Sequence, residues 1–137
     1  MYAISNEIIS RKLDIKLACP TGIHIGTLDK HLLKVMKRAG FYRLCFGIET
    51  GNQEMQKTIH KNIDLDKARR VIKDANDLGY WTSATFITGF PYETDKQLQD
   101  TFDFAKTCGI DFPIFYNLQI QPKTELYNKI KGENVCH

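Results

Sequence analysis

The sequence lacks the cysteine spacing of a metal or iron–sulfur site. Its cysteines are scattered, and the closest two are 26 positions apart; the four are Cys19, Cys45, Cys108 and Cys136. Neither CxxC nor CxxxCxxC occurs, although thiolates usually surround zinc or an iron–sulfur cluster at such spacings. We interpret the thiols as small core residues and predict no metal ligand among them.

Long apolar runs, blocks of like charge and export signals are missing as well. No stretch approaches the roughly 18 apolar residues of a membrane span, and residues 1–10 do not resemble a secretory signal. The net charge of +3 comes from interspersed Lys and Arg, which gives no support for nucleic-acid binding. We expect a cytoplasmic protein that forms a single domain over residues 1–137.

Familiar catalytic sets are also missing. No two histidines have metal-ligand spacing; the four are His24, His31, His60 and His137. No Ser/His/Asp or Cys/His combination can be assembled, so we predict no catalytic residue. This counts against a self-contained enzyme.

The sequence does contain a repeated strand–helix pattern, with three complete units and the strand of a fourth. Runs of β-branched and aromatic residues predict strands at 15–19, 42–48, 81–88 and 112–119. The helices between them require the strands to run parallel, so the fold class is α/β with about four parallel βα units. Four such units fit either an open doubly wound sheet or half of a TIM-like barrel.

The helices between these strands have clear start and stop signals. Caps are expected at Thr27, Asp64 and Thr94, and each helix is expected to end at a glycine; these are Gly40, Gly79 and Gly109. The apolar stripe of the third helix includes Phe102, and the aromatic residues of 112–116 are expected to pack under helices.

Two of the strands have a partly polar face. Strand alternation places Arg43, Cys45, Gly47 and Glu49 on one side, and it groups Ser83, Thr85 and Ile87 in the same way. A parallel strand covered on both faces would be almost continuously apolar. The polar faces are typical of strands that line a ligand-holding barrel, although packed and hydrogen-bonded polar core residues are the alternative.

Ligands of parallel α/β folds gather at the carboxyl ends of the strands. Glu49 lies at such an end between two glycines, and it could accept hydrogen bonds from a ribose diol or pair with a neighbouring lysine. The run from Gly47 to Asn52 is not a GxGxxG fingerprint. Lys61 precedes the second long helix, where a lone lysine is usually a surface residue, and Leu118 could be core or an apolar wall.

Three ordered motifs within residues 14–130 resemble the radical S-adenosylmethionine superfamily. The first runs from Ala39 to Glu54 and is similar to the family's G-x-E-S-G-x-x-E stretch, with the segment 58–61 following at the expected distance. The second, 86–94, resembles F-I-x-G-x-P-G-E-T, and the third, 121–127, resembles P-x-P-G-T-E-L-Y. Any one of them alone would be weak evidence, but together they form a specific match.

The resemblance implies the C-terminal half of a radical S-adenosylmethionine barrel, with strands three to six of six. It implies that Glu49 contacts the ribose hydroxyls of S-adenosylmethionine and that Lys61 contacts the methionine carboxylate. It further implies that Thr85 lies on the ribose side and that Ile87 and Leu118 flank the adenine. A carboxylate suits a diol, an ammonium suits a carboxylate, and alkyl groups suit a purine.

Three features depart from the family pattern. The CxxxCxxC loop that holds the [4Fe–4S] cluster is absent, while Tyr92 and Lys123 stand where relatives carry glycine. Because of Lys123, we expect that the last turn need not follow the family's conformation. Without the cluster thiolates, this chain alone is expected to make no adenosyl radical.

The resulting hypothesis is a fragment of a radical S-adenosylmethionine enzyme that positions the cofactor. The alternative is a non-catalytic remnant or accessory half-barrel that binds a nucleotide or a partner chain. The G-x-E-[ST]-G-N-Q-E style of the second strand resembles members with a cobalamin-binding domain, which implies cobalamin as a further cofactor. Substrate and reaction type are not encoded in these residues.

A half-barrel would leave the edge of its first strand unpaired. We therefore predict that the chain associates with the missing N-terminal half of the barrel, or with itself, or that it aggregates.

Overall fold

The computed structural model describes residues 1–132, so Cys136 and His137 lie outside the described residues. Its elements in chain order are α1 (Tyr2–Ser10), β1 (Leu17–Ile23), the short 3-10 helix η1 (Ile25–Thr27), α2 (Lys30–Arg38), β2 (Phe41–Glu49), α3 (Gln53–Thr58), α4 (Leu65–Asp77), β3 (Trp81–Thr88), α5 (Asp95–Thr107), β4 (Phe112–Asn117) and α6 (Glu125–Gly132).

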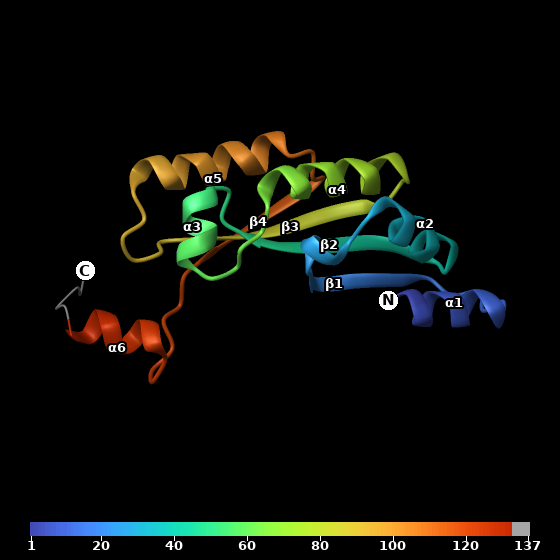
Figure 1. The fold of residues 1–137 in the computed structure, drawn as a ribbon, viewed down its shortest axis with the longest axis horizontal. Helices are drawn as coiled ribbons and strands as arrows, with labels where there is room; N and C mark the ends of the chain where they lie inside the picture. The colour runs from blue at the N-terminus through green and yellow to red at the C-terminus, as the bar shows by residue number, and fades with distance from the viewer. Residues whose placement is uncertain (133–137) are drawn as a thin grey trace.

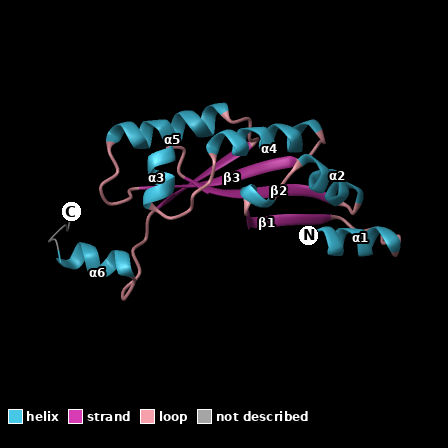
Figure 2. Cartoon of the chain, viewed as in Figure 1, coloured by secondary structure: helices cyan, strands magenta, loops and turns pink. Residues whose placement is uncertain are grey.

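The four strands form one parallel sheet in the order β1-β2-β3-β4, which confirms the α/β class and the four parallel units. Helices α4 and α5 lie along the same side of the sheet (Figure 1). Helix α6 follows a long loop after β4 and stands apart from the sheet (Figure 2). The opposite face of the sheet is therefore free of the connecting helices α4 and α5.

The helix boundaries follow local chemistry, with one correction to the sequence analysis. The predicted caps at Asp64 and Thr94 are confirmed, and Thr94 forms a full capping box with Gln97. The predicted cap Thr27 is wrong. Asp29 caps the helix by accepting the Leu32 N–H at 2.7 Å, and α2 begins at the next residue, Lys30. Thr27 lies instead in η1.

The three helix-ending glycines adopt the backbone that their position demands. Gly40, Gly79 and Gly109 have φ values of 98°, 72° and 89°, in the left-handed region. A residue without a Cβ adopts this conformation at little cost. These glycines turn each helix back toward the next strand, as expected from the sequence.

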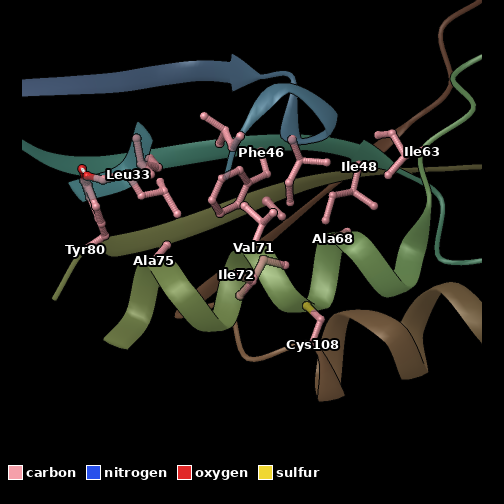
Figure 3. Packing of buried hydrophobic residues seen from close by; sticks show 14 of the residues in the cluster. Leu33, Phe46, Ile48, Ile63, Ala68, Val71, Ile72, Ala75, Tyr80 and Cys108 are labelled. Atoms are coloured by element: carbon pink, nitrogen blue, oxygen red, sulfur yellow. Dashed lines mark hydrogen bonds between the residues drawn. The ribbon is translucent and has the colours of Figure 1, made fainter. Parts of the chain in front are cut away.

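The core lies between the sheet and its helices. Leu44, Phe46 and Ile48 of β2 are fully buried. Phe46 and Ile48 face α4 residues such as Ile72 (Figure 3). At one end of this layer, the Tyr80 hydroxyl donates to the Leu33 carbonyl oxygen at 2.8 Å. This bond ties β3 to α2, because Tyr80 directly precedes the strand.

Other expectations about strands and core are corrected. Phe104, not Phe102, is the buried aromatic residue of α5, and Phe102 is 40% exposed. Two aromatic residues of β4, Phe112 and Tyr116, are exposed rather than packed under helices, because they share the sheet face of Ser83 and Ile87, which α4 and α5 do not cover (Figure 1). Phe115 lies on the other face, where its ring contacts Phe86 and Phe102 of α5. Strand β1 begins two residues later than predicted and continues to Ile23, whereas β4 ends at Asn117.

Within residues 1–132, no helix is both long enough and apolar enough to cross a lipid bilayer.

Candidate functional site

Glu49 and Lys61 meet at the carboxyl end of β2. The Lys61 Nζ atom donates to Glu49 Oε1 at 2.9 Å, and we call this contact the site ion pair. The Glu49 side chain is only 17% exposed and that of Lys61 is 36% exposed, so both charges are partly withdrawn from water. Partial burial strengthens the attraction relative to a fully solvated pair.

Two glycines make room for the site ion pair. A Cβ atom on Gly47 would lie 3.0 Å from Glu49 Oε1 and 3.7 Å from Lys61 Nζ. A Cβ atom on Gly22 of β1 would lie 3.0 Å from the Gly47 nitrogen. The glycines therefore let β1 approach β2 closely and let the Glu49 carboxylate fold back over the sheet.

Glu49 does not continue the alternation of its strand. Its φ of 70° lies in the left-handed region, and the pairing of β2 with β3 shifts between Gly47 and Glu49. Simple alternation is therefore insufficient to place this carboxylate, although it groups Cys45 with Ser83 and Gly47 with Thr85 as neighbours across the strands. A non-glycine residue in this region is uncommon and often marks a functional site.

The other predicted site residues lie on β3 and just beyond β4. Thr85 is the cross-strand neighbour of Gly47, and Ile87 lies two residues farther along the same face of β3. Both are partly exposed. Leu118 follows the end of β4, and its N–H donates to the Thr88 oxygen at 2.9 Å, which extends the pairing of the two strands.

Arg43 and Ser83 give the same sheet face a polar floor. The Arg43 guanidinium lies 4.6 Å from the centre of the Trp81 ring, its neighbour in the strand register. The Arg43 Nε atom and the Ser83 hydroxyl are buried and have no hydrogen-bond partner among the described residues. Orphaned polar atoms at this position suit a face that is completed by further polar groups.

A buried polar cluster behind the site was missed in the sequence analysis. The hydroxyls of Thr50 and Thr101 lie 3.1 Å apart, and the Asn52 amide donates to Asp100 at 2.7 Å. The fully buried Gln56 binds the loop from the other side. Helical spacing could have placed Gln56 on the buried side of a helix, but the six residues of α3 are too few for that signal.

Tyr92 and Lys123, the two departures from glycine, keep a glycine-like backbone. Their φ values are 68° and 70°, respectively. Both turns therefore take the left-handed conformation despite the side chains, although we expected that the Lys123 turn could differ. The Lys129 ammonium of α6 lies over the Tyr92 ring, 5.1 Å from the ring centre.

The cysteines do not form a cluster site. Within residues 1–132, no three His, Cys, Asp or Glu side chains are placed to hold a metal ion. Burial raises the pKa of the Cys19 and Cys108 thiols, and this disfavours the thiolate form that an iron–sulfur cluster requires. Cys45 is buried as well. The residues described here do not fit a [4Fe–4S] cluster.

In parallel α/β folds, ligands bind at the carboxyl ends of the strands, which is where the site ion pair lies. In a comparison with protein families, a profile of the Radical SAM superfamily matches residues 6–105. The chain belongs to the radical S-adenosylmethionine superfamily.

Relatives and solved structures agree with this assignment. The chain is 30% identical over 132 residues to an uncharacterized methyltransferase of Pyrococcus horikoshii, and the match covers 96% of this chain and 28% of that protein. It also resembles the structure of the coproporphyrinogen III oxidase HemN, a radical SAM enzyme of Escherichia coli (TM-score 0.77, 19% identity, 94% of this chain and 31% of that one).

A third similar protein is the radical S-adenosylmethionine methyltransferase TsrM of Kitasatospora setae, whose structure contains cobalamin and a [4Fe–4S] cluster. The TM-score is 0.79 at 17% identity, over 96% of this chain and 27% of that one. The chain thus spans less than a third of the length of each of these three proteins.

Proposed function

We propose that these residues form the S-adenosylmethionine-holding wall of a radical S-adenosylmethionine enzyme. The observation that carries the proposal is the site ion pair, which presents a carboxylate and an ammonium at the carboxyl end of β2. The complete protein would bind its [4Fe–4S] cluster through residues outside this chain. When bound, such a cluster supplies the electron that cleaves S-adenosylmethionine.

The side chains of the site match the chemistry of S-adenosylmethionine. Glu49 would accept hydrogen bonds from the ribose diol, and Lys61 would pair with the methionine carboxylate. Thr85 would add a hydroxyl on the ribose side, while Ile87 and Leu118 would cover the adenine ring. The space left by the absent Cβ of Gly47 supports this fit, because it keeps the two charged groups accessible together.

For the complete protein, we propose methyl transfer with cobalamin as a further cofactor. The proposal is supported by the relatives above, of which one is called a methyltransferase and another is a methyltransferase with bound cobalamin. The residues described here would contribute binding and orientation rather than a reacting group. We accordingly expect the isolated chain to be inactive.

The test is calorimetric titration of S-adenosylmethionine into the chain and two variants. Glu49→Gln removes the negative charge of the site ion pair and leaves Lys61 in place. Glu54→Gln is a matched control, because Glu54 is exposed on the neighbouring helix α3. Charge-assisted hydrogen bonds contribute about 1.5–3 kcal/mol, so Glu49→Gln should weaken binding roughly 10- to 150-fold. Absence of binding by the unmodified chain, or equal binding by both variants, would contradict the proposal.

We further propose that the preceding part of the barrel covers the open side of β1. Large apolar side chains are exposed on α1 and on the segment that leads into β1, where Ile4, Leu13 and Ile15 are 57%, 49% and 37% exposed. Strand β1 pairs with β2 on one side only. Sedimentation of the isolated chain should therefore reveal self-association or aggregation, and a monodisperse monomer that unfolds cooperatively would count against the half-barrel.

A further inference from the structure

The backbone at Glu49 forms a tight and strained turn. The Thr50 N–H donates to the Ile48 oxygen at 2.9 Å, two residues back, while the intervening Glu49 has a φ of 70°. This is the γ-turn with a positive central φ, the rarer and more strained of the two types. Such strain persists only where the surroundings impose the conformation.

The Gln56 side chain grips both flanks of this turn. Its Nε2 atom donates to the Ile48 oxygen at 2.7 Å and to the Thr50 oxygen at 2.8 Å, so it holds the carbonyl groups on either side of Glu49. The residue is fully buried, where water cannot replace these bonds. Gln56 thus fixes the direction in which the Glu49 carboxylate leaves the backbone.

The same residue also holds the loop that carries Lys61. The Gln56 main-chain oxygen accepts from the N–H groups of Lys61 and Asn62, both at 3.0 Å. Its Oε1 atom accepts from the Ile63 N–H at 3.2 Å. Every side-chain polar atom of Gln56 is therefore used, and its bonds join the strand end of Glu49 to the loop of Lys61.

We propose that Gln56 is the positioning residue of the cofactor site, which sets the two charged groups at the spacing that the ligand requires. The inference rests on the proposed S-adenosylmethionine site, and Gln56 acts only through Glu49 and Lys61. Partners one step removed from a ligand commonly alter affinity about 10- to 100-fold in metal sites. We expect an effect of similar size here.

The test compares Gln56→Met with Thr82→Val. The methionine keeps the shape of the side chain and removes all of its hydrogen bonds. Thr82 is equally buried, and its hydroxyl shares its one hydrogen between Asn76 and Asp111 at the opposite end of the sheet, so its loss is a matched control for stability. Both variants should unfold more easily, but only Gln56→Met should bind S-adenosylmethionine about 10- to 100-fold more weakly.

A second readout is independent of the ligand. Amide hydrogen exchange at Thr50 reports the turn directly, because this N–H closes it. In Gln56→Met, exchange at Thr50 should accelerate more than exchange in the β3 core, whereas Thr82→Val should leave Thr50 protected.

The outcomes separate the two proposals. Failure of the unmodified chain to bind S-adenosylmethionine overturns the proposed function, whatever Thr50 does. Binding by the unmodified chain, with unchanged affinity and unchanged Thr50 exchange in Gln56→Met, overturns the positioning role. If Gln56→Met does not fold, Gln56→Glu replaces it. This variant keeps the acceptor for Ile63 but loses the amide donor, so at neutral pH it should weaken binding as well.

Discussion

Replacing Gly51 by alanine tests how tightly the loop after β2 is pressed against α5. A Cβ atom at this position would lie 2.5 Å from the Phe104 Cβ, 2.8 Å from the Thr101 Cα and 2.9 Å from the Asp100 oxygen. Two of these atoms belong to the backbone of α5, and the third is bound directly to it. No rotation of a side chain can relieve the clash, so the helix itself must move.

The expected cost follows from these contacts. Overpacking of a close-packed region costs about 1–3 kcal/mol, and displacement of α5 also strains the bond from the Gly51 N–H to the Thr101 hydroxyl at 3.1 Å. Loss of one such hydrogen bond adds about 1 kcal/mol. Alanine also lowers the conformational entropy of the unfolded chain, which stabilises the folded state by about 0.4–1 kcal/mol. The net loss should be about 2 kcal/mol, which lowers the melting temperature by about 8 °C.

The matched control is Gly26→Ala, where the short contact is with a movable group. A Cβ atom there would lie 2.8 Å from an atom of the His24 ring, which is exposed and free to rotate. This variant should stay within about 0.5 kcal/mol of the unmodified chain. Circular dichroism melts at equal protein concentration measure both. Equal melting temperatures for Gly51→Ala and Gly26→Ala would refute the steric argument.

Three further predictions concern the caps, the core and the site. Thr94→Ala should lower the free energy of unfolding by about 1 kcal/mol through loss of the capping box, with Thr94→Ser unchanged in urea titration. Tyr80→Phe should cost about 1 kcal/mol at pH 8; an unchanged urea midpoint would exclude this. Because burial raises the pKa of Tyr80, the unmodified chain should also lose more stability than Tyr80→Phe above about pH 10. Gly47→Ala should weaken the binding of S-adenosylmethionine, because the added Cβ would push against the site ion pair, but it should change the urea midpoint little. Unaltered affinity in calorimetry would show that this space is not needed.

The parallel sheet and the helix ends were predictable from sequence because their causes are local. Glycines such as Gly79 and a cap such as Asp64 act within a few residues. The exposure of Phe112 was not predictable in this way, because Phe112 lies on the sheet face that α4 and α5 leave uncovered (Figure 1). Which face the helices cover is a property of the whole fold.

The candidate site was likewise predictable where its causes are local and unpredictable where they are not. The strand-end position of Glu49 followed from the order of the predicted elements, and the family motif pointed to Lys61. Pairing of Glu49 with a neighbouring lysine was one alternative from the sequence. Its geometry could not be derived, since it depends on a left-handed residue and on a buried glutamine that bonds to two separate segments. These hydrogen bonds join turn and loop residues, which leave no periodic signal in the sequence. The helix α3 that carries Gln56 escaped prediction because six residues are too few to show helical spacing.

The site ion pair also has a consequence for ionic strength. Lys61 and Glu49 already neutralise each other in the structure, so a ligand that carries a carboxylate and a diol would take over both partners instead of meeting an isolated charge. Binding would replace the Glu49–Lys61 contact with a contact between Lys61 and the ligand carboxylate, while Glu49 would then face a diol that carries no charge. Mobile ions screen separated charges far more than such close contacts. The site ion pair should therefore compete with the ligand for both side chains at high salt as well as in dilute buffer.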